Sequence, residues 1–331
     1  MPALPTARAT PSAAASATIS ATTPADAIAD PAQGPHGRAG QLLLLLALST
    51  LWGASYTFIR IGVATIAPVT LIAARTLIAG ALLVAWMAAT GVPLPRGAAV
   101  WRRFAVQAML NSVVPFTLIA WAEQSVPAGL ATILNSSSPV IAVLGTWLVT
   151  RHERITARKL LGVAAGLAGI CLIVGASALD GLGRQLVPQL AIVAATVCYA
   201  GAAIYGRGFR DLPAIAPAAG SLVVGAALLV PASLALDRPW TLHPSPASLA
   251  ALLALSVFST ALAFVIYFRL VRTLGPVGTT AQAYLRVPVG VAIGMVFLGE
   301  SLAAPAWLGL ACVVTGVAAM TLPARRRAGG A

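Results

Sequence analysis

Charged residues are scarce in this sequence. Only 9% of its 331 residues are Asp, Glu, Lys or Arg, whereas 59% are hydrophobic, and the mean hydropathy is +0.91. A soluble domain carries about 25% charged residues, so this chain has too little polar surface to cover a water-soluble fold of its size. The composition therefore excludes a soluble enzyme.

Acidic residues and lysine are the scarcest of the charges. The chain has 8 acidic residues against 21 basic ones, for a net charge of +13, and Lys159 is its one lysine. Most of the basic residues stand singly or in short groups between long apolar runs. That distribution is typical of membrane orientation signals rather than of a groove for nucleic acid, so we expect no nucleic-acid partner.

Residue types for catalysis and metal binding are also few. The three histidines lie outside the apolar runs, and the sequence has no HExxH, no GxSxG, no phosphate-binding loop and no paired carboxylates. The three cysteines lie inside apolar runs without metal-ligand or disulfide spacing, and we interpret them as small core residues. We expect no catalytic residue, no metal and no cofactor.

Long apolar runs are the main feature that is present. From Gln41 the chain alternates such runs with short polar or Pro/Gly-rich breaks, and about 20 helical residues cross a bilayer core of about 30 Å. The runs are continuous rather than alternating, which excludes a membrane barrel. The pattern predicts an all-α integral membrane protein with ten transmembrane helices, at 41–59, 68–89, 104–122, 128–149, 160–177, 188–205, 213–236, 248–268, 277–298 and 303–322.

Loop charges set the expected orientation. With the N-terminus inside, thirteen basic residues fall in inside loops and the C-terminal tail, and three, Arg60, Arg184 and Arg238, fall outside. By the positive-inside rule both termini are cytoplasmic. Residues 1–40, rich in Ala, Thr, Ser and Pro, are expected to form a disordered cytoplasmic tail, and 323–331 a basic one.

The two halves of the chain share a series of residues in the same order. The series runs through Gly129, Pro139-Val140, Glu153 and Leu161-Gly162 in the first half, and through Gly278, Pro288-Val289, Glu300 and Leu308-Gly309 in the second. We expect a first repeat over 41–177 and a second over 188–322. Because each repeat holds five helices, the second is inverted, an architecture of transporters that bind substrate near the midplane between the repeats. We interpret Glu153 and Glu300 as anchors or caps for the helix that follows each.

These motifs resemble those of the EamA-like family in the drug/metabolite transporter superfamily. Leu51-Trp52-Gly53-Ala54-Ser55 is similar to the opening motif of that family, and the clearest match is Tyr284-Leu285-Arg286-Val287-Pro288-Val289 running to Phe297-Leu298-Gly299-Glu300. The resemblance covers residues 41–322. It implies ten helices in two inverted repeats, cytoplasmic termini, and export of amino acids or other small metabolites across the bacterial inner membrane.

Three charged side chains fall within or beside the spans. A charge at the bilayer centre costs about 2.5–3.5 kcal/mol on insertion scales, so it normally faces a cavity or a partner. Arg286 lies near mid-depth of the ninth helix, where its planar guanidinium suits a substrate carboxylate; a structural arginine bonded to helix carbonyls is the alternative. Arg75 is able to pair with Glu123, although a structural role is favoured for Arg75. Glu123, at the outer end of the third helix, is the candidate for proton coupling, with interfacial capping as its alternative.

Uncharged polar side chains gather in the first, third, fourth and ninth helices. In the fourth and ninth they stand just before a proline, and such matched segments indicate a substrate site built on irregular helices. Interhelical hydrogen bonding without a ligand is the alternative. The predicted substrate-binding residues are Trp52, Tyr56, Asn111, Asn135, Ser137, Gln282, Tyr284 and Arg286.

Together these features predict an inner-membrane transporter that exports amino acids or related small metabolites by alternating access. Two other classes stay open: a membrane enzyme acting on a lipid-linked substrate, and a non-transporting membrane scaffold. The expected partners are a small-molecule substrate and the lipid bilayer, and a homodimer is an open alternative.

Overall fold

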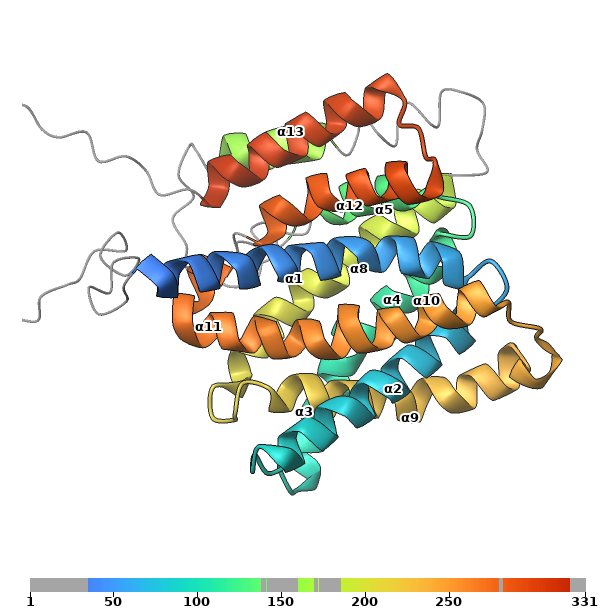
Figure 1. Ribbon diagram of the computed structural model, residues 1–331, viewed down its shortest axis with the longest axis vertical. Coiled ribbons are helices and arrows are strands. Elements are labelled where there is room, and N and C mark those ends of the chain that lie inside the picture. The colour runs from blue at the N-terminus through green and yellow to red at the C-terminus, as the bar shows by residue number, and fades with distance from the viewer. Residues whose placement is uncertain are drawn as a thin grey trace, which may run out of the picture.

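The computed structural model describes residues 35–137, 141, 160–169, 172, 186–279 and 282–321. Every regular element in these ranges is a helix (Figure 1). Glu153, Arg184 and the tail predicted at 323–331 lie outside the described residues, as does most of the tail predicted at 1–40.

The helices of the first half cover the first three predicted spans, and the spans predicted at 128–149 and 160–177 lie only partly within the described residues. These helices are α1 (Pro35–Gly62), α2 (Pro68–Ala89), α3 (Ala98–Ala108), the π-helix η2 (Met109–Val113), α4 (Val114–Ala122) and α5 (Ala128–Asn135). A further helical stretch covers Leu160–Gly169.

The regular elements in the described part of the second half are also all helices. They are α8 (Leu186–Gly206), the short η3 (Arg207–Phe209), α9 (Ala216–Leu236), η4 (Pro239–Thr241), α10 (Pro246–Ser256), the π-helix η5 (Val257–Leu262), α11 (Ala263–Thr279), α12 (Gln282–Leu298) and α13 (Ala304–Thr321).

Helices of the two halves pack against each other rather than within separate halves. The helix α2 lies along α9, α1 along α12, and α4 along α8. In Figure 1 the helices stack in layers, from α13 at the top, through α12 and α5, to α2, α3 and α9 at the bottom. The centre of the molecule is therefore built from both halves.

Several helices extend beyond the apolar runs that predicted them. The helix α1 begins at Pro35 rather than at 41, α3 begins at Ala98 rather than at 104, and α11 continues to Thr279 through a predicted loop that holds Arg272. Hydropathy marks the part of a helix that is buried in lipid, whereas the helix itself ends where its backbone hydrogen bonding is broken. The extra turns therefore lie at the polar ends.

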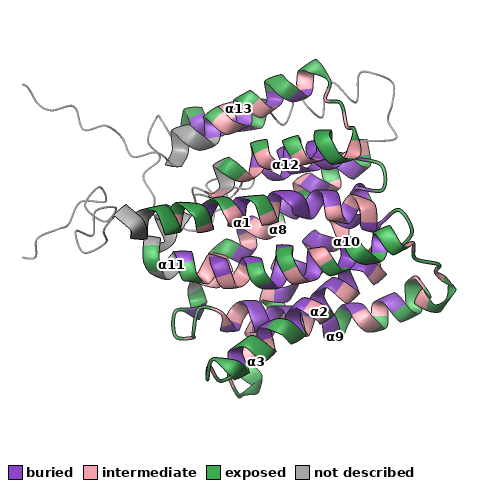
Figure 2. Cartoon of the chain, viewed as in Figure 1, coloured by how far each residue is buried: buried purple, intermediate pink, exposed green. Residues whose placement is uncertain are grey.

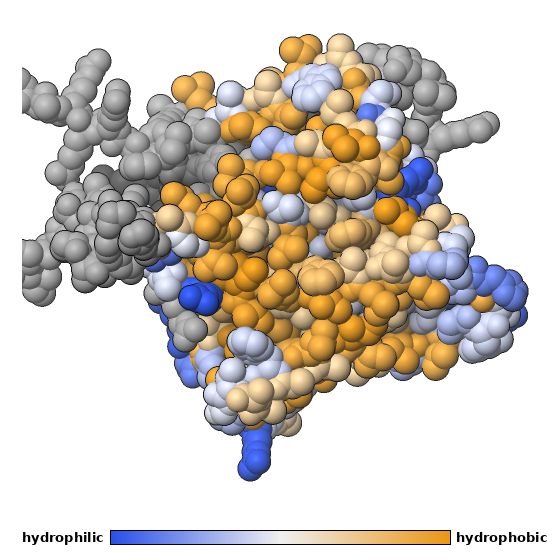
Figure 3. All heavy atoms as spheres, in the orientation of Figure 1, coloured by the Kyte–Doolittle hydropathy of each residue, from blue (hydrophilic) through white to orange (hydrophobic). Residues whose placement is uncertain are grey.

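The exterior of the bundle is apolar. Six helices of the described part are long and apolar enough to cross a membrane, namely those at Ala39–Gly62, Pro68–Ala89, Ala98–Ala122, Leu186–Gly206, Ala216–Leu236 and Pro246–Leu270. Many large hydrophobic residues of these helices are exposed, and Figure 2 shows exposed residues along the outer faces of the bundle. Figure 3 shows an apolar belt between more polar ends. These features define a multi-pass helical membrane protein.

Two π-helical segments interrupt corresponding helices in the two halves. The segment η2 separates α3 from α4, and η5 separates α10 from α11. A π-bulge inserts an extra residue into a helical turn and occurs frequently at functional sites. Both segments carry buried small polar side chains, Ser112 in η2 and Ser259 and Thr260 in η5.

The closest approach between α1 and α12 depends on glycine. A Cβ atom at Gly53 would lie 3.0 Å from the main-chain nitrogen of Gly290 and 3.1 Å from the carbonyl oxygen of Arg286. These are backbone atoms that a side-chain rotation cannot move away. Gly53, part of the first-helix motif, therefore brings Arg286 against α1.

Candidate substrate site

A buried cluster of polar and aromatic side chains lies where the two halves meet. Tyr56 of α1 and Asn135 of α5 are 4% and 3% exposed. The Asn135 side-chain amide donates a hydrogen bond to the Tyr56 hydroxyl. Two predicted site residues from helices 79 positions apart in sequence are thus brought together.

Arg75 of α2 is a buried cation at one side of this cluster. It is 5% exposed, its Nε donates a hydrogen bond to Thr260 Oγ1 at 2.9 Å, and its guanidinium carbon lies 3.8 Å from the centroid of the Phe116 ring. The Thr260 hydroxyl donates its own proton to the Leu255 carbonyl at 2.8 Å, so its oxygen is left to accept from Arg75. A hydrogen bond and a cation–π contact hold the guanidinium in place.

Tyr199 of α8 extends the cluster across the second half. Its ring centroid lies 6.5 Å from that of Phe116, and Arg75, Arg286 and Tyr56 lie near its hydroxyl. Sequence reasoning did not select Tyr199 or Phe116. A signal was present for Tyr199, because it corresponds to Trp52 when the two halves are aligned.

Arg286 of α12 lies beside the same cluster of polar and aromatic side chains. It is half-buried, it lies near Tyr56 and Tyr199, and its Nε is buried with no hydrogen-bond partner among the described residues. The structure gives no helix carbonyl as a partner of its guanidinium in that part of the chain.

Two further predicted site residues use their side chains in local packing. Trp52 packs edge-to-face or tilted against rings of α11, with its ring centroid 6.2 Å from that of Phe264 and 5.6 Å from that of Tyr267. Ser137 is buried, and its hydroxyl donates to the Leu134 carbonyl in its own turn at 2.6 Å. Neither side chain makes the interhelical hydrogen bond that the sequence analysis gave as the alternative to substrate binding: Trp52 packs against rings, and Ser137 bonds within its own turn.

The last three predicted residues lie on η2 and α12. Asn111 is half-buried in η2. Gln282 begins α12, and its side-chain oxygen is buried without a hydrogen-bond partner among the described residues, while its main-chain carbonyl accepts from Ser49 Oγ at 3.1 Å. Tyr284 lies on α12, but its side chain is outside the described part of the structure.

Glu123 is fully buried at the end of α4. Neither of its carboxylate oxygens has a hydrogen-bond partner among the described residues, and its main-chain carbonyl accepts from the Arg60 guanidinium. The suggested pair with Arg75 is not formed. Arg75 instead donates to Thr260, because the hydroxyl offered by η5 lies within reach of its Nε.

Glu300 links the two halves at the same end of the bundle. Its two carboxylate oxygens accept from the main-chain nitrogens of Ala128 and Gly129, at 2.6 and 2.7 Å. These are the first N–H groups of α5, which lack partners within their own helix, and the helix dipole favours a negative charge there. Glu300 is therefore a helix cap, but for α5 in the first half rather than for the following helix α13, as the sequence suggested.

Other polar contacts hold the same end together. Asp237, at the end of α9, accepts from the main-chain nitrogen of Thr70 in α2 at 2.7 Å, and the Thr70 and Ser233 hydroxyls lie 2.8 Å apart. Thr65 donates to Ser248 of α10 at 2.8 Å. We call this the Glu300 end; the loop charges predict that it faces the periplasm.

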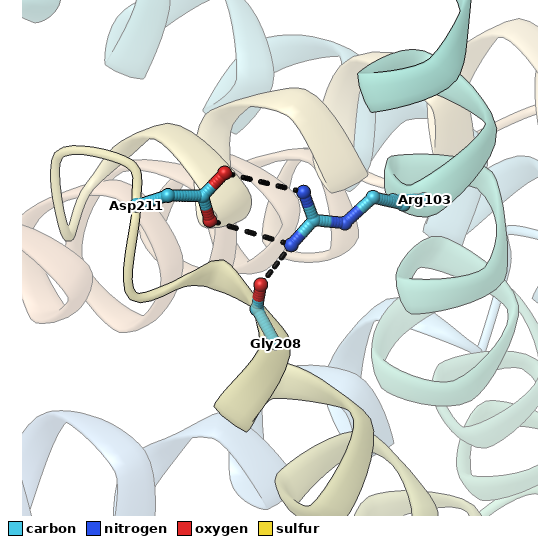
Figure 4. A network of polar contacts seen from close by, with 3 residues as sticks. All are labelled: Arg103, Gly208 and Asp211. Carbon is cyan, nitrogen blue, oxygen red and sulfur yellow. Dashed lines mark hydrogen bonds and ion pairs between the residues drawn. The ribbon is translucent and has the colours of Figure 1, made fainter.

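The opposite end carries the one ion pair found among the described residues. Arg103 lies 3.4 Å from Asp211 and donates to the Gly208 carbonyl (Figure 4). Its guanidinium carbon also lies 4.6 Å from the Phe209 ring centroid. The pair is largely exposed and contributes little to stability; it joins α3 to the α8–α9 connection.

Surface pockets lie at the helix ends rather than at the buried cluster. One, of about 310 Å³ at the Glu300 end, is lined by residues that include Arg60, Ser248 and Leu298. Another, at the Arg103 end, is lined by residues that include Arg96 and Trp101. Neither of these two pockets is lined by a residue of the buried cluster.

The chain matches the family model of the EamA-like transporter family twice, over residues 39–175 and 187–322. It is 30% identical to the uncharacterized inner membrane transporter YedA of Escherichia coli (strain K12), over 84% of this chain and 89% of that protein. A probable amino-acid metabolite efflux pump of the same strain is 27% identical over 83% of this chain and 92% of that protein.

Two further matches differ in what they support. A probable terminal-alkyne amino-acid exporter of Streptantibioticus cattleyicolor is 29% identical over 64% of this chain and 69% of that protein. A protein crystal structure aligns with a TM-score of 0.60 at 22% identity, covering 87% of this chain and 99% of the other. At that identity the match supports the fold alone.

The helical membrane bundle and the two matched regions define the class, a membrane transporter rather than an enzyme. The chain belongs to the EamA-like transporter family of the drug/metabolite transporter superfamily.

Proposed function

We propose that this protein exports amino acids or related small metabolites across the bacterial inner membrane by alternating access. In this proposal ten transmembrane helices form two inverted five-helix repeats, and both termini are cytoplasmic. The observation that carries the proposal is a cluster of the buried Tyr56, Arg75 and Asn135 with the half-buried Tyr199 and Arg286, which combines α1, α2 and α5 with α8 and α12. Transporters built from inverted repeats bind substrate at such an interface.

The composition of the cluster favours a polar substrate. Buried guanidinium, amide and phenol groups are costly inside a membrane protein and are retained where they bind a ligand or one another. The names of two relatives, an amino-acid metabolite efflux pump and an amino-acid exporter, agree with export of a small polar molecule. A lipid-modifying enzyme and a scaffold have no comparable observation in their favour.

Alternating access requires one end of the bundle to open at a time. The bonds of Glu300 to α5 and of Asp237 to Thr70 join the two halves at the Glu300 end. In the proposed cycle this structure represents the state closed at that end, and release to the periplasm requires these bonds to break.

Flux in proteoliposomes tests the function. Purified protein is reconstituted and the uptake of a panel of radiolabelled amino acids is measured by counterflow, with and without an imposed pH gradient. We expect saturable flux of at least one amino acid, loss of that flux in Asn135→Ala, and unchanged flux in Val296→Ala, a control whose side chain is 76% exposed on the lipid-facing surface. No saturable flux for any amino acid, or for sugars, nucleosides and cationic drugs, contradicts the proposal.

A further inference from the structure

A pocket at the Arg103 end lies between two connections that join helices. It has a volume of about 1010 Å³ and is lined by residues of the α2–α3 connection, by Trp101 of α3, and by Leu212 and Pro213 before α9. Pockets of about 300–1,000 Å³ hold small molecules, and the loop charges predict that this end faces the cytoplasm. We propose that the pocket binds the headgroup of an anionic phospholipid from the cytoplasmic leaflet.

The basic residues around this pocket outnumber the acidic ones. Arg96 lines it, Arg102 and Arg210 lie within two residues of its lining in the chain, and all three are exposed. The two connections hold a single acidic residue, Asp211, which pairs with Arg103 (Figure 4). Three guanidinium groups are therefore left without a carboxylate partner among the described residues. Anionic lipids give the cytoplasmic leaflet a negative surface potential, which attracts such groups.

The lining of the pocket is largely apolar, which favours a lipid over a free anion. Besides Arg96 and Gly97 it consists of three prolines, two leucines and Trp101. The Trp101 indole N–H donates to the Pro95 carbonyl at 3.1 Å, and its ring meets Phe104 edge-on with 5.6 Å between the centroids. The indole therefore presents an apolar wall, at the headgroup level where tryptophan is enriched in membrane proteins. A phospholipid buries apolar atoms against this wall, whereas a free phosphate has none to bury.

An exposed stripe continues from the arginines into the apolar belt. Arg102, Val106 and Met109 are spaced four and three residues apart, so they share one face of the helix at Ala98–Ala122. Val106 is 44% exposed and Met109 40% exposed. The arginine lies at the polar end of this face and the apolar residues lie deeper. A lipid whose phosphate is bound by the arginines can thus place an acyl chain along Val106 and Met109.

Lipid binding to the full-length protein tests the site. The purified protein is stripped of lipid in detergent and titrated with phosphatidylglycerol or phosphatidylcholine, and its lipid-bound forms are measured by native mass spectrometry. We expect the first phosphatidylglycerol to bind at least fivefold more tightly than phosphatidylcholine, the effect of one basic residue near an anionic lipid. Millimolar inorganic phosphate, the matching soluble anion, is expected not to displace the bound lipid.

Substitution of the arginines locates the bound lipid. Arg96→Gln and Arg102→Gln are each expected to weaken phosphatidylglycerol binding about fivefold, and the two together about 25-fold. Both side chains are exposed, so the variants are expected to fold as the wild-type protein does. Arg269→Gln is the matched control, because it removes the same charge from an exposed position on α11 that does not line the pocket. It is expected to leave the affinity unchanged.

Three outcomes overturn the proposal. An equal loss of affinity in Arg269→Gln and in Arg96→Gln means that the arginines act only as a diffuse orientation signal. Equal binding of phosphatidylcholine and phosphatidylglycerol means that the pocket does not recognise headgroup charge. Displacement of the lipid by inorganic phosphate assigns the pocket to a soluble anion instead.

Discussion

Some buried polar side chains join different helices, and the hydrogen bond between Tyr56 and Asn135 joins α1 to α5. Tyr56→Phe removes the acceptor while preserving the ring, so the buried Asn135 amide loses one bond. We expect a loss of about 1–3 kcal/mol in stability and a weaker affinity for substrate. Thermal unfolding in detergent measures the first effect and counterflow the second. Tyr205→Phe, at the Arg103 end of α8, is the control; equal stability of the two variants would contradict the prediction.

The carboxylate of Glu300 makes two charge-assisted bonds to the start of α5. Glu300→Gln removes the charge and turns one acceptor into a donor that faces a backbone N–H. We expect it to cost about 1–2 kcal/mol, the range for caps and helix-dipole interactions. Unfolding of Glu300→Gln is compared with that of Asp211→Asn, which removes a carboxylate from an exposed ion pair. A smaller loss in Glu300→Gln than in Asp211→Asn would show that the cap contributes no stability.

At the residue scale, sequence reasoning found polar residues but not their partners. Tyr56, Asn135 and Arg286 were selected because they interrupt apolar helices; in the structure Asn135 donates to Tyr56, and Arg286 lies near Tyr56. The contact of Arg75 with Thr260 was not predicted, because periodicity shows which residues share a face of one helix but not which faces meet. The same limit applies to Glu300, whose bonding partners lie 171 and 172 positions away.

At the scale of helices, the packing of α1 on α12 depends on the absence of side chains at the crossing. Gly53→Ala places a methyl group 3.0 Å from a backbone nitrogen of Gly290, so the helices must separate. We expect a loss of about 1–3 kcal/mol, typical of overpacking. Gly40→Ala is the matched control, since no atom lies within 4 Å of its added methyl group. The fraction of monodisperse protein after heating distinguishes the two, and equal survival would contradict the prediction.

Helix positions were predictable where hydropathy alone determines them. The span of α2 is found where it was predicted, at Pro68–Ala89, because Pro68 begins the helix and the apolar run ends with it. The π-helices were not predicted, since no local pattern distinguishes them from the α-helices they interrupt. The two π-helices lie at corresponding positions in the two halves. This agrees with the internal repeat that the shared series of Gly, Pro-Val and Glu residues indicated.

At the scale of the whole molecule, the proposed opening of the Glu300 end can be blocked by a cross-link. In a variant lacking the three native cysteines, Thr70→Cys with Ser233→Cys replaces two hydroxyl groups 2.8 Å apart on α2 and α9. We expect oxidation to abolish counterflow and a reductant to restore it, while each single-cysteine variant is insensitive to both. Full transport by the oxidised pair would mean that these helix ends stay together throughout the cycle.

The bond between Glu300 and α5 also constrains how the polypeptide matures. The ribosome completes α5 long before residue 300 is synthesised, so the first N–H groups of that helix have no carboxylate cap while most of the chain is still being inserted. The first half therefore attains its final stability only after Glu300 has been synthesised late in translation and caps α5. A chain truncated before residue 300 is expected to insert into the bilayer and yet to be degraded faster than the full-length protein.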